Sequence, residues 1–198
     1  MILNSKYSSL IIRSVLTAFL GIALVAGAMN TTNAMAPATK TAKATFVNPQ
    51  GEEIGTATLE DFGKNVLIKL DVKGVSEGYH AIHIHETADC TPLMTGEDVS
   101  PFTNTGSHFN PMNNDHGMVQ HKGPHAGDLP NVYANENGVV KAELINEMIT
   151  LHDENDGDRA SVFDEDGSAF IIHAGTDDYT SQPTGDAGGR VACAVIEK

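Results

Sequence analysis

The sequence predicts an all-β protein, built as an antiparallel sandwich or barrel. Short segments with alternating apolar and polar residues recur along the chain, and turn residues separate them. No window of about 12 residues shows the apolar stripe of an amphipathic helix. Two long stretches rich in small and polar residues interrupt the strands, and loops of that length are usually functional or disordered.

Each predicted strand has a local signal. The first strand leads through the turn residues Asn48–Gly51 into a return strand, and Asn135–Gly138 closes a later hairpin with a glycine. The clearest period-2 alternation lies in Val66–Val72. In chain order, the predicted strands are Thr41–Val47, Glu53–Glu60, Val66–Val72, Tyr79–Glu86, Asn131–Ala134, Val139–Ile145, Ala169–His173 and Val191–Ile196.

The two irregular stretches are Cys90–Pro130 and Gly175–Gly189. Both contain too few apolar residues to be ordered by a hydrophobic core of their own. Metal coordination can order such a segment, because ligand binding contributes directly to the folding free energy.

Composition restricts the class of partner. The chain has 198 residues, which favours one domain, and 40% of them are hydrophobic, which is enough for a core. Its formal net charge of −14 argues against nucleic acid and anionic membrane surfaces as partners, because both require a basic surface.

The N-terminal segment has the layout of a secretory signal peptide. Lys6 and Arg13 supply positive charge, and the uncharged stretch Val15–Ala28 is shorter than the ~20 residues of a membrane span. Small residues at cleavage spacing follow, ending at Ala28 or at Ala34. We expect cleavage after Ala34, which leaves one domain, 35–198, exported to the periplasm and free of the membrane. An uncleaved anchor is the alternative.

The two cysteines, Cys90 and Cys193, are an even number in a chain predicted to be exported, which favours one disulfide. That bond would tie the first long loop to the last strand. Two metal thiolates are the alternative, although no ligand-like residue stands beside Cys193.

The nine histidines provide the first functional signal, because all of them lie between His80 and His173. On a strand, alternate residues share a face, so His83 and His85 point to one side while His80 points to the other with the isoleucines. Two imidazoles from one strand suit copper or zinc. We expect His80 to be a hydrogen-bonded core residue, and His173 could reach the His83 and His85 pair from its own strand.

The first long loop supplies a second group of potential ligands. Three imidazoles and a carboxylate complete a tetrahedral zinc site without an open position, which is typical of a structural zinc. A solvated histidine-rich loop is the alternative, and His121 lies in the same loop. The predicted zinc ligands are His108, His116, His125 and Asp128.

These motifs together resemble the copper,zinc superoxide dismutases, from about residue 42 to the C-terminus. The first is the pattern Gly-x-His-x-x-His-x-His. The long separation of Cys90 from His108 resembles the bacterial periplasmic branch. The matching segments are Gly78–His85, Gly106–Pro111, His116–Gly117, His125–Leu129, Ile172–His173 and Gly185–Ile196.

The resemblance implies an eight-stranded antiparallel Greek-key β-barrel with two long functional loops. It implies one copper and one zinc ion per chain, and the dismutation of superoxide to dioxygen and hydrogen peroxide. His108 would bridge the two metals and deliver a proton, Asp177 would link a copper histidine to a zinc histidine, and Arg190 would attract the anionic substrate. The implied copper ligands are His83, His85, His108 and His173, the zinc ligands are those named above, and the disulfide joins Cys90 to Cys193.

The chain departs from the eukaryotic members at one point. They carry a lysine just before the Thr-Gly-x-Ala-Gly stretch, which here begins at Thr184 after Ser181–Pro183. Lys122 is a possible substitute for that cation. A non-catalytic copper-binding relative and a zinc hydrolase are the alternative functions, although the chain has no His-Glu-x-x-His motif. A homodimer remains open, and His121 and His152 are expected at the surface.

Overall fold

The computed structural model describes residues 39–91, 93–95 and 98–198, with the backbone alone at 93–95 and 98–100. The predicted signal peptide, residues 1–34, lies outside these residues. Pro37–Lys198 forms one compact unit. Within the described residues, the protein has no helix with the length and apolar character needed to span a bilayer.

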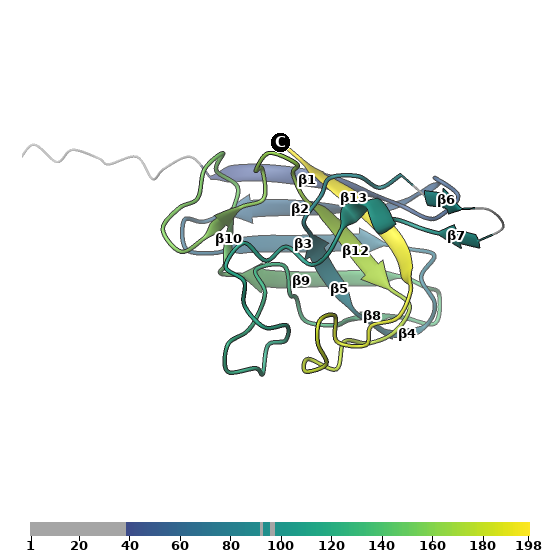
Figure 1. The fold of residues 1–198 in the computed structure, drawn as a ribbon. Coiled ribbons are helices and arrows are strands. Elements are labelled where there is room, and N and C mark those ends of the chain that lie inside the picture. Colours follow the sequence, from purple (N-terminus) through teal and green to yellow (C-terminus); the bar gives the residue numbers. More distant parts are fainter. Residues whose placement is uncertain (1–38, 92, 96–97) are drawn as a thin grey trace, which may run out of the picture. The chain divides into compact units, whose positions relative to one another are not determined.

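Nine strands form one antiparallel sheet in the order β4-β8-β9-β3-β2-β1-β13-β12-β5 (Figure 1). Strands distant in sequence pair with each other, such as β1 with β13 and β3 with β9, as in Greek-key proteins. The bounds of these strands are β1 Lys40–Val47, β2 Glu53–Asp61, β3 Val66–Val72, β4 Gly78–His80, β5 Ile82–His85, β8 Val132–Ala134, β9 Val140–Asn146, β12 Ala169–His173 and β13 Arg190–Glu197.

The sheet is nearly closed into a barrel, because its two end strands are consecutive in sequence. β4 at one end and β5 at the other are separated only by Ala81. The N–H of Ala81 donates to the carbonyl of Gly175, and its carbonyl accepts from the N–H of His173. The single strand predicted at Tyr79–Glu86 is therefore two short strands, and the predicted eight-stranded barrel is confirmed with that one break.

Five short elements were absent from the prediction because each has only two or three residues, too few for a periodic pattern. Four are strands that form two small pairs, and the fifth is a turn of 3-10 helix, η1. They are β6 Leu93–Thr95, β7 Asp98–Ser100, η1 Thr103–Thr105, β10 Ile149–Thr150 and β11 Ala160–Ser161.

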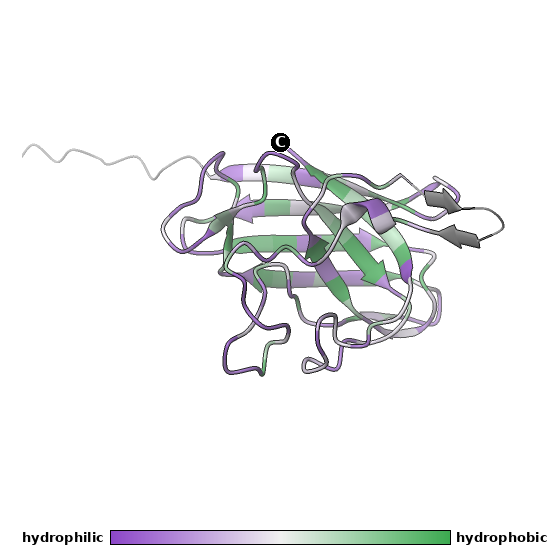
Figure 2. Ribbon diagram, in the orientation of Figure 1, coloured by the Kyte–Doolittle hydropathy of each residue, from purple (hydrophilic) through white to green (hydrophobic). Residues whose placement is uncertain are grey.

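Alternation along the strands places one set of side chains inside the barrel. The inward positions of β1, β2 and β3 are buried and mostly aliphatic, and the rings of Phe46 and Phe170 lie with centroids 6.0 Å apart. Apolar and polar bands accordingly alternate along the strands in Figure 2. A mostly aliphatic core is consistent with the low aromatic content of the chain, 6%.

The predicted disulfide is present between Cys90 and Cys193, with a Cα–Cα distance of 5.7 Å. It ties the loop after β5 to the centre of β13, as expected. The sulfur of Cys193 packs in a small buried cluster with Phe102, Ala169 and Ile171. The alternative of two metal thiolates is wrong.

A buried ion pair holds the small β10–β11 pair to the barrel. The guanidinium of Arg159 donates to the carboxylate of Asp61 at 2.6 Å and to the carbonyl of Ile149 at 2.9 Å. The same carboxylate accepts from the hydroxyl of Thr150 and the N–H of Leu151. Burial alone would raise the pKa of Asp61, but Arg159 and these hydrogen bonds lower it to about 2.

Candidate metal centre

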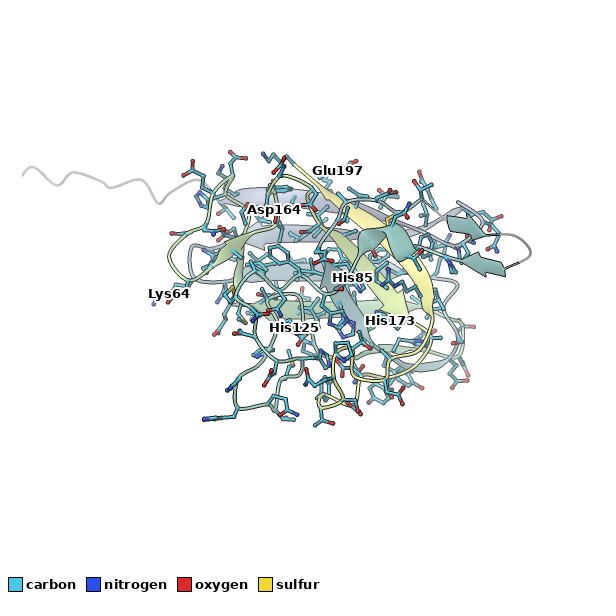
Figure 3. All side chains as sticks on the ribbon, in the orientation of Figure 1. Lys64, His85, His125, Asp164, His173 and Glu197 are labelled. Carbon is cyan, nitrogen blue, oxygen red and sulfur yellow. A yellow bond between two sulfur atoms is a disulfide. The ribbon has the colours of Figure 1, made fainter. Side chains whose placement is uncertain are left out.

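Three parts of the chain bring the predicted ligands together. β5 contributes His83 and His85, the end of β12 contributes His173, and the loop after β5 contributes the remainder. In Figure 3, His85, His125 and His173 gather on one side of the barrel, where the long loops meet. All seven predicted ligand side chains are buried.

The first cluster contains the four predicted copper ligands, with one donor atom from each residue lying within 4.8 Å of the others. Among the described residues, one ring nitrogen of each has no hydrogen-bond partner and is buried. Leaving a buried polar atom unpaired costs about 1–3 kcal/mol, so four such atoms converging on one point indicate a metal site. The unpaired atoms are His83 Nδ1, His85 Nε2, His108 Nε2 and His173 Nε2.

The opposite nitrogen of each ring is anchored. Two rings face carbonyl oxygens, since His85 Nδ1 lies 3.0 Å from Gly106 O and His173 Nδ1 lies 3.2 Å from Gly188 O. His83 and His108 instead face carboxylates. A neutral imidazole that donates from one nitrogen keeps a lone pair on the other, so these contacts orient all four lone pairs toward the metal position.

The second cluster surrounds one carboxylate oxygen. Asp128 Oδ1 lies 2.9 Å from His108 Nδ1, 3.1 Å from His116 Nδ1 and 3.3 Å from His125 Nδ1. Its other oxygen accepts from the N–H groups of Gly117 and His125, which fixes the carboxylate. Three nitrogens and one oxygen at this spacing suit a tetrahedral zinc ion.

Grouping by donor distance alone places His83, and not His125, with His108, His116 and Asp128. However, both nitrogens of His83 are already committed, Nδ1 to the first cluster and Nε2 to Asp177 at 2.9 Å. His125 Nδ1, in contrast, has its contacts inside the second cluster, 3.3 Å from Asp128 Oδ1 and 3.5 Å from His108 Nδ1. We therefore keep His125 as the proposed fourth zinc ligand.

The two clusters share one ring, because His108 presents Nε2 to the first and Nδ1 to the second. A single imidazole between two metals is the predicted bridge. The ring of His108 also lies against that of His83, with centroids 3.9 Å apart.

A second connection runs through Asp177, as the resemblance implied. One oxygen of Asp177 lies 2.9 Å from His83 Nε2, and the other lies 3.0 Å from His116 Nε2. Asn131 in turn holds the backbone of Asp177, donating to its carbonyl and accepting from its N–H, both at 2.9 Å.

The electrostatics of the two clusters differ. Burial lowers the pKa of His173 to about 3 and of His108 to about 4, and lowers that of His85 well below its ordinary value. These rings are therefore neutral at pH 7, the form that binds metals. Burial alone would lower the pKa of His116 too, but hydrogen bonds to Asp128 and Asp177 raise it to about 9. The zinc side thus concentrates negative charge, which favours a dication.

Arg190 is half-buried beside the first cluster. Its Nη1 donates to Phe102 O at 2.6 Å and to Thr105 Oγ1 at 2.8 Å, and its Nη2 donates to Gly106 O at 2.7 Å. His85 Nδ1 faces the same Gly106 oxygen, so the cation is fixed to the wall that holds a predicted copper ligand. Burial lowers the pKa of Arg190, but a guanidinium stays charged at neutral pH.

A cavity of about 300 Å³ opens beside this centre, lined by His108, His125, Glu86, Ser107 and Thr184 among others. Its lining includes the predicted bridge and a predicted zinc ligand, so it borders the second cluster.

The remaining histidines lie as predicted. His80 is buried on the other side of the strand break, with Nδ1 2.7 Å from His173 O and Nε2 2.8 Å from Ser76 O. His121 and His152 are exposed, as is Lys122. The sequence reasoning missed the carboxamides Asn131 and Gln182, which hold backbone groups at the centre, because side-chain amides leave no spacing pattern.

The comparisons with known proteins agree with this geometry. The family model described as copper/zinc superoxide dismutase matches residues 53–196. A protein named superoxide dismutase [Cu-Zn] 2 from Aquifex aeolicus is 42% identical over 156 residues, covering 78% of this chain and 85% of that protein. A superoxide dismutase [Cu-Zn] from Caulobacter vibrioides is 37% identical over 149 residues, covering 74% and 80%.

Solved structures show the same likeness. A double mutant of a superoxide dismutase-like protein from Bacillus subtilis has a TM-score of 0.68 at 32% identity, covering 79% of this chain and 97% of that one. The Cu/Zn superoxide dismutase from Brucella abortus has a TM-score of 0.64 at 25% identity, covering 80% and 100%. Fold, ligand clusters and sequence therefore place this chain in the copper/zinc superoxide dismutase family.

Proposed function

We infer that this protein catalyses the dismutation of superoxide, in which two superoxide ions and two protons give dioxygen and hydrogen peroxide. The observation that carries the inference is the set of four unpaired ring nitrogens at one point, one of them on a histidine shared with the zinc cluster. When bound, copper supplies one-electron redox chemistry and zinc supplies a fixed charge on the far side of the shared ring.

The residues of this chain have separate tasks in that reaction. His83, His85 and His173 hold their donor atoms in fixed orientations through their second nitrogens. His108 can hold a proton at Nε2, while Nδ1 stays in the zinc cluster. Arg190 attracts the anionic substrate through its charge, and three hydrogen bonds fix the position of that charge.

A non-catalytic metal-binding function is the competing outcome, since one relative, 35% identical over 157 residues, is named a superoxide dismutase-like protein. Purified protein loaded with both metals decides between them. We expect one copper and one zinc per chain together with superoxide turnover. Arg190→Ala should keep both metals and lose at least about 10-fold in rate, because the charge near the substrate is removed. Both metals without turnover in the wild type would overturn the enzymatic function.

We propose that residues 1–34 are a signal peptide and that the mature protein is periplasmic. The disulfide supports export, because such bonds persist in oxidising compartments. One relative, from Drosophila melanogaster, is named extracellular. Expressed in a Gram-negative host, the chain should appear in the periplasmic fraction with an N-terminus after Ala34. Full-length protein in the cytoplasm would contradict both statements.

A further inference from the structure

The loop 175–189 approaches the zinc cluster through a residue that has no assigned role. Gln182 belongs to the stretch where the eukaryotic lysine is missing. Its Oε1 accepts from the N–H of His116 at 2.8 Å, and its Nε2 donates to the carbonyl of His116 at 2.8 Å. One amide thus satisfies both backbone groups of a single residue, as a neighbouring strand would.

His116 is fully buried, and both of its ring nitrogens are occupied by Asp128 and Asp177. Within the described part of the chain, Gln182 is the partner of its backbone N–H and of its carbonyl. The ring and the backbone of this residue are therefore fixed by different groups, and Gln182 accounts for the backbone.

Gln182 is presented by a compact turn. The carboxylate of Asp178 accepts from the N–H groups of Thr180 and Ser181 at 2.8 and 2.7 Å, and also from the Ser181 hydroxyl. The N–H of Gly185 donates to Ser181 O at 2.7 Å, which closes the turn around Gln182. The side chain is exposed at its outer edge, so an ordered turn is needed to keep its amide on His116.

The two loops also meet backbone to backbone beside this contact. A Cβ on Gly117 would lie 2.0 Å from Tyr179 O, and a Cβ on Gly185 would lie 2.7 Å from His116 Nε2. Glycine at both positions lets the loop 175–189 lie directly on His116 and its neighbour. A displacement of this loop would therefore be transmitted to His116.

We propose that Gln182 is a positioning residue for zinc. By holding both backbone groups of His116, it fixes the direction of Nδ1 toward Asp128 and slows the release of the ion. It also makes the order of the loop 175–189 depend on the zinc cluster, in addition to the connection through Asp177. The inference rests on the proposed zinc ligand set, in which His116 takes part.

The test compares zinc release from the wild type and three variants to a chromophoric chelator. Gln182→Met keeps the length of the side chain and removes both hydrogen bonds to His116, together with a weaker one of 3.2 Å to Thr180 O. Gln182→Glu keeps an acceptor for the N–H only. Gln120→Met is the matched control, because Gln120 reaches the same opposing loop through a single bond, 3.2 Å to Thr180 O. Partners of metal ligands typically change metal affinity by about 10–100-fold, so Gln182→Met should release zinc about 10-fold faster.

Amide hydrogen exchange gives a second readout that a general loss of stability would not mimic. The N–H of His116 should exchange faster in Gln182→Met, and the N–H of Ala57 in the β2 strand should not change. Gln182→Glu should also release zinc faster, because a carboxylate faces the carbonyl of His116, yet should keep the N–H protected. This second variant keeps the proposal falsifiable if Gln182→Met does not fold.

Unchanged release from both Gln182 variants would overturn the proposal, and so would an equal acceleration in Gln120→Met. A wild-type protein that holds no zinc would instead overturn the ligand set, and this inference with it. If the wild type holds zinc but all variants release it at the wild-type rate, the role of Gln182 is refuted and the ligand set stands.

Discussion

Single atoms carry most of the functional information in this protein. Among the described residues, the ring nitrogens that face the metal position are recognised because they have no hydrogen-bond partner. The other nitrogen of each ring has a partner, which fixes the orientation of the ring. His80, by contrast, has both nitrogens engaged by carbonyl oxygens and is therefore closed to a metal. The sequence predicted this distinction from alternation along one strand, although the structure places His80 on β4 and His83 and His85 on β5.

Replacing His108 with alanine should weaken both metals, because the same ring serves both clusters. Loss of an outer partner alone weakens metals by about 10–100-fold, so loss of this ligand should exceed about 10-fold for each ion and abolish most activity. Metal content after dialysis against a moderate chelator measures the effect. His121→Ala is the control, since His121 is an exposed histidine of the same loop. If His108→Ala kept its full content of copper and zinc, His108 would not be the bridging ligand.

Two buried serines should respond to alanine with opposite signs. Ser168 is fully buried and its hydroxyl has no partner, so Ser168→Ala should raise the free energy of unfolding by up to about 1 kcal/mol. The hydroxyl of Ser161 donates to His152 O and accepts from the N–H of Phe163. Ser161→Ala should therefore lower the free energy of unfolding by about 1–3 kcal/mol. Urea titrations of the zinc-loaded variants measure both. The same sign for the two variants would contradict the explanation.

Strands with a continuous local pattern were predicted correctly from the sequence, whereas features that depend on contacts between distant segments were not. β3 has the predicted bounds because its alternation covers the whole strand, and β12 has them because it is a short apolar run that is buried at every position. The break at Ala81 could not be predicted, because it depends on hydrogen bonds to Gly175 and His173, more than 90 positions away in the chain. The clusters were predictable from motif spacing, whereas the contacts of Asn131 and Gln182 arise only when two loops meet.

The β10–β11 pair should make the protein sensitive to acid. The pKa of Asp61 is about 2 in the folded protein against an ordinary value of 3.8, so its charged form stabilises the fold by about 2 kcal/mol. Because the folded pKa is the lower one, this stability is complete above pH ~4 and disappears as the pH falls toward 2. Chemical denaturation between pH 2 and 6 measures it.

Asp61→Asn is the matched variant for that measurement. It removes the titrating group and leaves the buried Arg159 with only its longer, 3.2 Å contact to the exposed Asp156, so it should be less stable at pH 6 and lose less stability on acidification. Lys69, whose exposed pair with Glu60 lies on the outer face, gives the control. Lys69→Met should change the loss of stability at low pH very little, because exposed ion pairs contribute about 0–1 kcal/mol. If wild type and Asp61→Asn lost the same stability between pH 6 and pH 2, Asp61 would not be the source of the acid sensitivity.

At the scale of the whole molecule, the negative net charge repels the anionic substrate. The chain carries −14, yet the cation Arg190 is fixed beside the first cluster, and the exposed Lys122 lies on the loop that supplies the zinc ligands. Charges near the cavity act over shorter distances than dispersed carboxylates, and salt screens interactions beyond about 8–10 Å. We therefore expect the rate with superoxide to fall as ionic strength rises.

Lys122→Glu tests which cation guides the substrate. If Lys122 substitutes for the missing lysine, the salt dependence should flatten or reverse in this variant while both metals stay bound. Lys141→Glu, on the outer face of β9, is the control and should keep the wild-type slope. Stopped-flow rates between about 10 and 300 mM salt cover the change in screening. An unchanged slope in Lys122→Glu excludes Lys122, and a rising rate in the wild type would show that the global charge dominates.

The break at Ala81 has a consequence for the order in which a newly made chain can become functional. Chains emerge N-terminus first, and β5 has no partner in the main sheet until β12 has emerged. β4 likewise waits for β8. A nascent chain that ends before His173 thus lacks one predicted copper ligand, and the strand that carries two others has, among the described residues, only its bridges to His108 and Asp128 as backbone neighbours. We therefore expect copper to bind in its final geometry only after almost the entire polypeptide has been made.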